Sequence, residues 1–415
     1  MWSMTTTTAP PLTRTVSRSR VRHSIGFWAA AYAFLIVLAY NAVPTPLYGI
    51  YQQRDGLSSF AITVIFAAYA VGVGTSLFTV GHLSDWHGRR RLFAPALVVC
   101  MLSAVVFLVW RDLPGLILGR VLGGIGVGAV TATATAWLSE LHSAARPDAS
   151  AKRAQIVSTA ANLGGIGVGP LVAGALAEWV GHPLTVPYVV SLVALAAALI
   201  AVAVTPETRE RPDPFPAYRP QRVSVPRQAV ARYVAGGIGA AISFSVFGLF
   251  TSLAPSFLAG TLHHRSYALA GVTAFAVFAA AVVAQLALAG RSTRSAIATG
   301  IATMVLGMAV LVVAVFLSSP SLALFEIGGV ISGAGAGALF KGVVTSVAEI
   351  ATPDSRAEAL AGMFLAGYIG LSVPVLGLGV MTRYLSPRVS LVIFTGVLAA
   401  AILAATPRLL QRRSA

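Results

Sequence analysis

The chain has 415 residues, of which 57% are hydrophobic and only 10% are charged. A soluble protein has about 25% charged residues, so this composition argues against soluble enzymes, disordered proteins and nucleic-acid-binding proteins. The net charge of +16 does not indicate a nucleic-acid groove, because Lys and Arg gather between apolar runs and at the chain ends. The composition indicates a protein that lies in a lipid bilayer.

Twelve apolar runs follow one another along the chain, and each is about as long as, or longer than, the roughly 20 residues that a membrane-spanning helix needs. The longest polar gap separates six runs from six. We therefore expect an all-α membrane protein with 12 transmembrane helices in two six-helix bundles. The runs lie near residues 25–50, 58–82, 92–110, 114–139, 153–179, 183–204, 231–257, 267–289, 295–317, 321–349, 357–381 and 387–407.

The domain boundaries follow from these runs. We expect an N-terminal tail at 1–24, a first bundle at 25–204, a linker at 205–230, a second bundle at 231–407 and a C-terminal tail at 408–415. The first 24 residues are rich in Thr, Ser and Arg and lack the short apolar stretch and cleavage site of a signal peptide. We interpret them as a flexible cytoplasmic tail.

Lys and Arg are distributed unevenly between the two sides of the membrane. With both termini on one side, 22 of them fall in segments on that side and five on the other. Cytoplasmic loops carry the excess of Lys and Arg. We therefore expect a multi-pass protein of the cell's inner (plasma) membrane with both termini in the cytoplasm.

The two halves of the chain also resemble each other weakly. The fourth and tenth runs share three glycines at a spacing of two, and a glutamate follows each set. Two related halves predict pseudo-symmetric bundles around a central cavity. The corresponding pairs, offset by 209 positions, are Gly124 and Gly333, Gly126 and Gly335, Gly128 and Gly337, and Glu140 and Glu349.

The loop between the second and third runs combines two glycines, an aspartate and three arginines, and reads GHLSDWHGRRR from Gly81 to Arg91. It resembles the signature loop of the major facilitator superfamily, although Trp86 stands where the family usually has a basic residue. The resemblance implies a twelve-helix transporter that works by alternating access. It also implies a cytoplasmic gate formed by Gly81, Asp85, Gly88, Arg89, Arg90 and Glu140.

Asp85 and Arg89 are the charged centre of this gate. We expect Asp85 to face the N-terminus of the eleventh span, where the helix dipole favours an anion. Arg89 is expected to pair with Glu140 at the cytoplasmic end of the fourth span. The gate would close the cytoplasmic side and break when the cavity opens to that side.

Arg120 lies inside the fourth run, where a charge is costly and suggests a function. The stretch from Leu116 to Gly128 resembles a superfamily motif whose arginine is associated with proton coupling, with Gly123 in place of the usual glutamine. The alternative is that the Arg120 side chain extends to the outer surface.

Glu326 lies three positions before the residue equivalent to Arg120 in the repeat. A carboxylate in a low-dielectric cavity can exchange protons, so we predict Glu326 and Arg120 as the proton-coupling residues. The alternative is an ion pair between these two side chains at the mouth of the cavity. Glu178, at the outer end of the fifth run, is interpreted as a loop-end charge.

The fifth run resembles the antiporter motif of proton-coupled drug exporters. The family's last Gly-Gly appears here as Ala-Gly, and Ile156 replaces an upstream glycine. Glycines four positions apart predict a flat helix face for close contact, and ordinary packing of small residues is the alternative. The matching residues are Gly165, Gly169, Pro170 and Gly174.

Aromatic and polar residues within the spans predict the lining of a substrate cavity. Aromatic rings suit a broad, apolar organic substrate, and Lys341 is a candidate for contact with substrate or a counter-charge. Packing against lipid or within the core is the alternative for each residue. The candidates are Tyr32, Asn41, Tyr69, Asn162, Phe247, Lys341 and Tyr368.

The sequence contains neither the Gly-x4-Gly-Lys-Ser/Thr loop of ATP-driven proteins nor Cys/His spacing typical of a metal site. We expect no cofactor, no metal and no enzymatic activity. We expect efflux of a small organic compound or drug by proton antiport, from a monomer in the lipid bilayer that binds no nucleic acid. The alternatives are proton-linked uptake of a nutrient or small organic acid, and a non-transporting membrane sensor.

Overall fold

The computed structural model describes residues 12–80, 83–209, 218–219, 223, 225–352 and 355–411. Within these residues the chain forms helices and connecting segments, and no β-strand. Twelve helical segments in the described part of the chain are long and apolar enough to cross a membrane. This finding confirms the predicted all-α membrane fold with twelve spans.

The helices divide between the two halves of the chain. The first half contains α1 (Leu12–Ala42), α2 (Pro44–Asp55), α3 (Ser59–Thr79), α4 (Ser84–His87), α5 (Arg89–Val109), α6 (Leu113–Ala145), α7 (Lys152–Trp179) and α8 (Val186–Val204). The second half contains a 3-10 turn (Arg227–Ala229), α9 (Val230–Ser252), α10 (Ala254–Gly260), α11 (Tyr267–Ala287), α12 (Thr293–Phe316), α13 (Leu322–Ile350), α14 (Arg356–Tyr384) and α15 (Pro387–Leu409).

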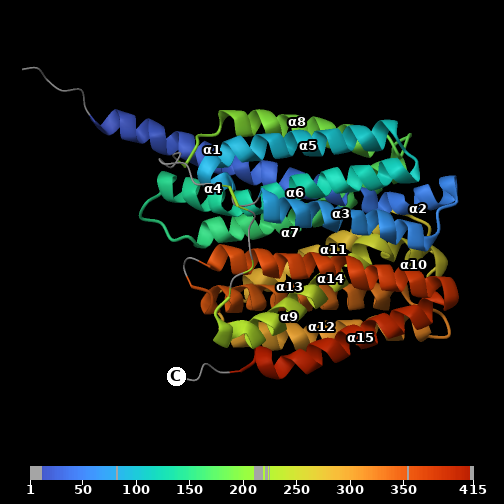
Figure 1. Ribbon diagram of the computed structural model, residues 1–415. Coiled ribbons are helices and arrows are strands. Elements are labelled where there is room, and N and C mark those ends of the chain that lie inside the picture. Colours follow the sequence, from blue (N-terminus) through green and yellow to red (C-terminus); the bar gives the residue numbers. More distant parts are fainter. Residues whose placement is uncertain are drawn as a thin grey trace, which may run out of the picture.

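The two halves lie side by side with their long helices roughly parallel to a common direction (Figure 1). Helices α1 to α8 form the upper half of that view and α9 to α15 the lower half. α1 begins and α15 ends at the same end of the molecule, on the left, which we name the termini end. α2 and α10 lie at the opposite end, which we name the α2 end.

The first span of each half is interrupted near the α2 end. α1 stops at Ala42 and α2 starts at Pro44, while α9 stops at Ser252 and Pro255 lies at the start of α10. Proline has no backbone N–H to continue the helical hydrogen bonds, which explains both breaks. At its other end α1 begins at Leu12, within the segment expected to be a tail.

The repeated glycines make equivalent contacts in the two halves. On α6, Gly124 packs against the backbone of Tyr69 in α3, and on α13 its counterpart Gly333 packs against Val277 in α11. Gly126 faces α5 in the first half, and its counterpart Gly335 faces α12 in the second half. α6 and α13 therefore occupy the same position in two bundles with the same packing, as the repeat predicts.

Two helix pairs make the main contacts between the halves. α7 packs on α11, where Gly174 lies against the backbone of Tyr267 and Gly271. α3 packs on α14, where the rings of Tyr69 and Tyr368 meet edge-on with centroids 6.1 Å apart. These pairs frame the space in which the candidate site lies.

Candidate functional site

A cavity of about 430 Å³ lies between the two halves. Its wall includes residues of α1, α2, α3, α6 and α7 from the first half and of α9, α11, α13 and α14 from the second. Lys152, Ala289 and Thr345 belong to this wall and are exposed, and they lie where α7, α11 and α13 reach the termini end. The cavity therefore opens toward the termini end.

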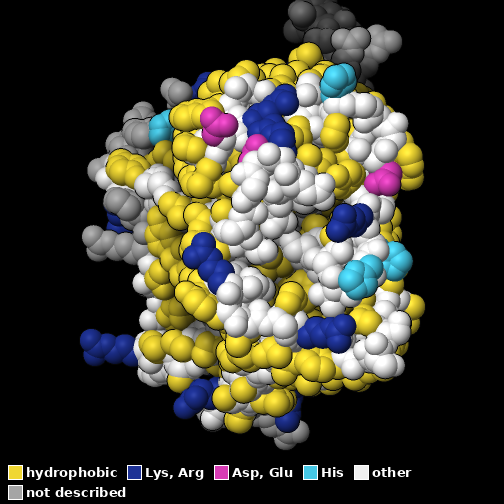
Figure 2. Space-filling model, turned by 90° about the vertical axis from the view of Figure 1, so that its right-hand side faces the viewer, with side chains coloured by type: hydrophobic (Ala, Val, Ile, Leu, Met, Phe, Trp, Pro, Cys, Tyr) yellow, Lys and Arg dark blue, Asp and Glu magenta, His cyan; other side chains and the backbone are white. Residues whose placement is uncertain are grey.

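Contacts between the halves close the α2 end. The hydroxyl of Ser256 in α10 donates a hydrogen bond of 3.1 Å to the side-chain oxygen of Gln52 in α2. The guanidinium carbon of Arg383 in α14 lies 4.3 Å from the ring centroid of Phe60 in α3. Figure 2 looks onto this end, where charged side chains lie scattered among hydrophobic and uncharged ones. The structure is thus open at one end and closed at the other.

Arg120 of α6 is part of the cavity wall, and only 4% of the residue is exposed. Its Nη1 donates a hydrogen bond of 2.6 Å to the carbonyl oxygen of Asn41, next to the break between α1 and α2. Its guanidinium carbon lies 4.5 Å from the ring centroid of Tyr69 and 5.5 Å from that of Phe66. The side chain therefore stays inside the molecule instead of extending to the surface.

The charge of Arg120 has no counter-ion in the part of the chain that the structure describes. Its Nε is buried without a hydrogen-bond partner there, and none of the ion pairs includes it. Lys341 and Lys152 are further cations of the cavity wall, and the Lys341 ammonium donates a hydrogen bond to the backbone carbonyl of Gln285 in α11. Among the described residues, no Asp or Glu lines the cavity.

Aromatic rings form a continuous wall within the cavity. Tyr69, which lies beside the arginine, contacts Tyr368, and Tyr368 contacts Phe244 at a centroid distance of 5.4 Å. Phe340 lies 5.0 Å from Phe244 and 5.8 Å from Phe364. All five rings line the cavity, so it combines cationic groups with a broad aromatic surface.

Six of the seven residues predicted to line the cavity do so, and Tyr32 does not. Tyr32 is 39% exposed, and its hydroxyl donates a hydrogen bond of 3.3 Å to the carbonyl oxygen of Ala194 in α8. Because Tyr32 and Asn41 are nine positions apart, about two and a half helical turns, they lie on opposite faces of α1. The six lining residues are Asn41, Tyr69, Asn162, Phe247, Lys341 and Tyr368.

Glu326 does not belong to the cavity wall. The hydroxyl of Thr273 in α11 donates a hydrogen bond of 2.5 Å to its carboxylate. Glu326 lies on the same face of α13 as Gly333, two turns further along, and this face packs on α11. The described part of the chain holds no ion pair between Glu326 and Arg120, so the alternative of such a pair is wrong for this conformation.

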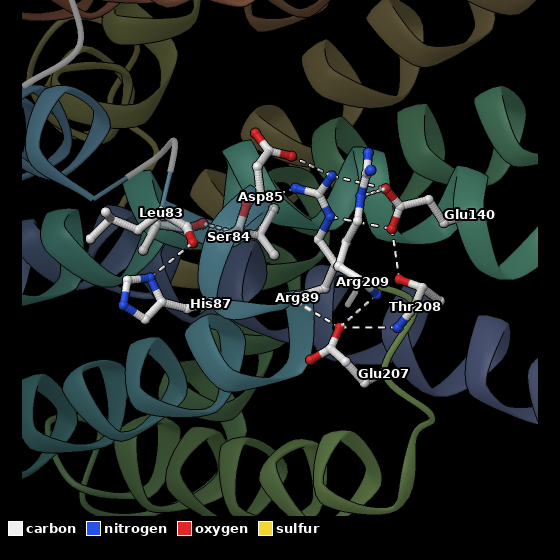
Figure 3. A network of polar contacts seen from close by, with 11 residues as sticks. Leu83, Ser84, Asp85, His87, Arg89, Glu140, Glu207, Thr208 and Arg209 are labelled. Carbon is white, nitrogen blue, oxygen red and sulfur yellow. Dashed lines mark hydrogen bonds and ion pairs between the residues drawn. The ribbon is translucent and has the colours of Figure 1, made fainter. Parts of the chain in front are cut away.

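A network of polar contacts surrounds Arg89 at the termini end (Figure 3). The Arg89 side chain is buried, with 3% exposed, and its Nη2 lies 2.7 Å from Asp85 and 2.9 Å from Glu140. Its Nη1 donates a hydrogen bond of 2.7 Å to the hydroxyl of Ser84. The predicted pairing of Arg89 with Glu140 is confirmed.

Three residues that follow α8 complete this network, although the sequence placed them in the linker. The Glu207 carboxylate accepts hydrogen bonds from the backbone N–H groups of Arg89 (2.8 Å) and Arg90 (3.1 Å), the first residues of α5. A carboxylate there satisfies free amides at the positive end of a helix. Thr208 and Arg209 donate hydrogen bonds to the carboxylate of Glu140 in α6, at 2.6 and 2.9 Å. The sequence analysis missed these three residues, and the charged run directly after the sixth apolar run is the signal that could have found them.

Gly88 makes the turn between α4 and α5 possible. Its φ of +102° is a conformation that side-chain-bearing residues rarely adopt. A Cβ at this position would lie 2.5 Å from a carboxylate oxygen of Glu207. The glycine is therefore needed both for the turn and for the approach of Glu207.

One expectation about the gate is corrected, and the position of Asp85 opposite the start of the eleventh span stays a prediction. Asp85 makes no hydrogen bond or ion pair with α14 among the described residues, and Gly81 lies outside them. The pairs of Arg89 with Asp85 and Glu140 are intact although the cavity is open at this end. The expectation that they break is wrong, because all three residues belong to the first half and opening the cavity does not separate them.

The glycines predicted as an antiporter motif lie where α7 contacts other helices. Gly165 and Gly169 face the backbone of α1, and Gly174 faces the start of α11. Pro170 lies inside α7. The flat glycine face therefore packs within the first half, and the end of the motif packs against the second half.

A family model described as Major Facilitator Superfamily matches residues 24–302 of the chain. The chain is 32% identical over 127 residues to the arabinose-proton symporter of Bacillus subtilis (strain 168), a match that covers 28% of this chain and 26% of that protein. It is 24% identical over 150 residues to the bacillibactin exporter of the same strain, covering 35% of this chain and 37% of that protein. The chain thus matches well under half the length of either relative.

Solved structures resemble the whole fold. A bacterial homolog of the human lysosomal transporter Spinster, in an inward-facing and occupied conformation, has a TM-score of 0.71 and 16% identity, with 97% of each chain covered. The peptide transporter POT in complex with alafosfalin has a TM-score of 0.73 and 14% identity, with 93% of each chain covered. At these identities the similarity shows the fold alone.

Proposed function

Because the chain belongs to the Major Facilitator Superfamily, and is therefore a transporter and not an enzyme, we propose that it exports a small organic compound in exchange for protons. The cycle is alternating access, in which one cavity between two halves opens to each side of the membrane in turn. The observation that carries this proposal is the cavity itself. It opens at the termini end while contacts between the halves close the α2 end.

We place the termini end in the cytoplasm of the cell, with the protein in the plasma membrane. The support is the excess of Lys and Arg in the sequence segments assigned to the same side of the membrane as the two termini, 22 against five. In this orientation the open cavity receives substrate from the cytoplasm. Contacts at the α2 end then have to separate before the substrate leaves on the outer side.

Glu326 is the proposed proton acceptor. It lies in α13 near the α2 end, which faces outward in the proposed orientation, and Thr273 links it to α11. Because Glu326 does not line the cavity, its protonation acts on the substrate through movement of α11 and α13, which form part of the cavity wall. Arg120, within the wall, is the second proposed proton-coupling residue.

Two observations favour export over uptake. The glycine motif of α7 resembles that of proton-coupled drug exporters, and part of the chain is similar to the bacillibactin exporter. Proton-linked uptake is the second candidate, because a shorter stretch is more similar to the arabinose-proton symporter. Both candidates use the same cavity and differ in the direction of substrate movement.

The test uses inside-out membrane vesicles that respiration has acidified, with a pH-sensitive dye inside. Drugs, dyes and small organic acids are added one at a time. Export by antiport predicts that some of them release protons from vesicles with the wild-type protein. Vesicles with the Glu326→Gln protein should not respond to the same compounds.

The matched control is Glu358→Gln, because Glu358 lies outside the cavity wall in the first turn of α14. This variant should respond like the wild type. Proton movement that persists in Glu326→Gln vesicles would exclude Glu326 as the proton acceptor. Accumulation of a compound by whole cells, without proton release in the vesicles, would contradict export and favour uptake.

A further inference from the structure

We infer that the cavity binds organic anions in which an acidic group is joined to an apolar or aromatic body, with Arg120 as the anchor of the acidic group. The inference rests on the proposed function in one respect, that the cavity is the substrate site. It adds the chemical class of the substrate, which the motifs and the family do not specify.

The charges of the wall all have one sign. Arg120, Lys152 and Lys341 line the cavity, and no acidic residue among those described does so. None of the three forms an ion pair in the described part of the chain. A cavity lined by one sign of charge between low-dielectric walls concentrates ions of the opposite sign. This cavity therefore attracts anions and repels organic cations.

Arg120 is the strongest of these groups because it is almost fully buried. A buried charge is costly unless it is paired and hydrogen bonded, yet only the Asn41 carbonyl accepts a hydrogen bond from this guanidinium and its Nε has no partner among the described residues. A bound carboxylate, sulfonate or phosphate supplies the missing anion. Guanidinium groups bind such anions through two parallel hydrogen bonds.

The three cations lie at two depths in the cavity. Lys341 is 12 positions beyond Gly329, the counterpart of Arg120 at the repeat offset of 209, which corresponds to about 18 Å along a helix. Lys341 and Lys152 are thus near the mouth at the termini end, and Arg120 is near the closed end. The lysines draw an anion into the mouth, and the arginine binds its acidic group at the far end of the cavity.

The aromatic wall indicates that the part of the substrate beyond its acidic group is apolar or aromatic. From Tyr69 the rings continue through Tyr368 to Phe244, so an anion held by the arginine places its body against them. Aromatic faces also attract cations, but the rings of Phe66 and Tyr69 already lie against the Arg120 guanidinium. The rings near the anchor therefore do not offer a site for a second cation.

The test compares three probes of the same shape with the purified full-length chain in detergent: 2-naphthoate, 2-naphthamide and 2-naphthylmethylammonium. The shift of the melting midpoint with probe concentration gives each dissociation constant. We expect 2-naphthoate to bind the wild type about 10- to 100-fold more tightly than the amide, as expected for hydrogen bonds to a charged group. The ammonium probe should bind most weakly.

Arg120→Gln should lower the affinity for 2-naphthoate to that of the amide, and Arg120→Lys should restore part of the preference. The control is Arg111→Gln, because Arg111 also makes hydrogen bonds within the first half but does not line the cavity. It should keep the full preference for the anion. If Arg120→Gln does not fold, the wild-type order of the three probes and Arg120→Lys remain as tests.

Equal affinities for the three probes, including no binding of any, would overturn the inference, as would tightest binding of the ammonium. An unchanged preference in Arg120→Gln would show that another group anchors the anion. Binding is measured without a membrane or a proton gradient. If the vesicles show no proton exchange but the purified protein prefers the anion, the proposed antiport fails and this inference stands. If the vesicles show proton exchange with a cationic compound and the purified protein does not prefer the anion, this inference fails and the proposed antiport stands.

Discussion

The carboxylate of Glu178 at the end of α7 accepts a hydrogen bond of 2.7 Å from the backbone N–H of Tyr267, the first residue of α11. The same oxygen accepts weaker hydrogen bonds from the Ser266 hydroxyl at 3.3 Å and the Ala268 N–H at 3.4 Å. The sequence indicated only a loop-end charge. The structure shows a contact between the two halves at the closed α2 end, with a carboxylate at the positive end of a helix.

Glu178→Gln should favour opening of the α2 end. Losing a charge at a helix N-terminus costs about 0.3–1 kcal/mol, which corresponds to an increase of about two- to fivefold in the population open at that end. The parent protein for this measurement carries Gly181→Cys and Gly260→Cys in a Cys100→Ala background. Spin labels on its two cysteines report the distance between the halves by double electron–electron resonance. Both glycines have open space where a Cβ would lie.

The control for this prediction is Asp112→Asn, because Asp112 is an acidic residue next to α6 whose side chain makes no capping hydrogen bond. Its distance distribution should match that of the parent. A shift of the same size in both variants would mean that general loss of negative charge, and not the contact with α11, causes the opening.

Asp85→Asn should lower transport, because it removes the half-exposed carboxylate that is free to meet the second half when the termini end closes, while leaving the folded protein nearly as stable as the wild type. The Asp85 side chain is 50% exposed, and an exposed ion pair contributes about 0–1 kcal/mol. Arg89 also keeps its pairing with Glu140. The measurement is the melting midpoint together with proton release in vesicles. Full transport by Asp85→Asn would exclude Asp85 from any gate.

Glu207→Ala should destabilise the termini end of the first half. It removes the carboxylate that accepts hydrogen bonds from the first two N–H groups of α5, and loss of such a cap costs about 0.5–2 kcal/mol. A lower melting midpoint measures this effect. Asp148→Ala, in the exposed turn before α7, should leave the midpoint unchanged. Equal midpoints for the two variants would show that Glu207 does not stabilise α5.

Gly169→Ala should lower both the melting midpoint and transport. The added Cβ would overlap the backbone of Ala39 in α1, so the two helices would have to separate. Gly164→Ala on the same helix is the matched control, because nothing lies within 4 Å of its Cβ position. Alanine is the better helix former, so this variant should be at least as stable as the wild type. If both variants behaved alike, close contact would not explain the motif.

The proposed orientation can be tested with single cysteines in the Cys100→Ala background. A membrane-impermeant maleimide added to whole cells should label Gly181→Cys, at the α2 end. It should label Ser150→Cys, in the exposed turn before α7, only after the membrane is permeabilised. The reverse labelling would place the termini end outside the cell and would contradict export from a cavity that opens to the cytoplasm.

The apolar runs by themselves determined the twelve spans, because a helix in lipid must be apolar over about 20 residues and must satisfy its own backbone. The repeat offset likewise predicted that Gly124 and Gly333 would occupy equivalent positions, since close helix contact in a membrane requires small residues. The charges of the signature loop predicted the pairing of Arg89 with Glu140, because the chain has only 13 Asp and Glu residues and few of them could reach Arg89.

Only the tertiary structure decided which face of each helix meets the cavity. Tyr32 and Glu326 looked as suitable as Asn41 and Arg120, but Tyr32 lies partly exposed beside α8 and Glu326 lies on a face that packs against α11. Lipid-facing and cavity-facing positions carry similar small and apolar residues, so the rotation of a helix about its axis leaves little trace in the sequence. The cap of α5 by Glu207 joins residues 118 positions apart, and such a contact depends on how the whole bundle packs.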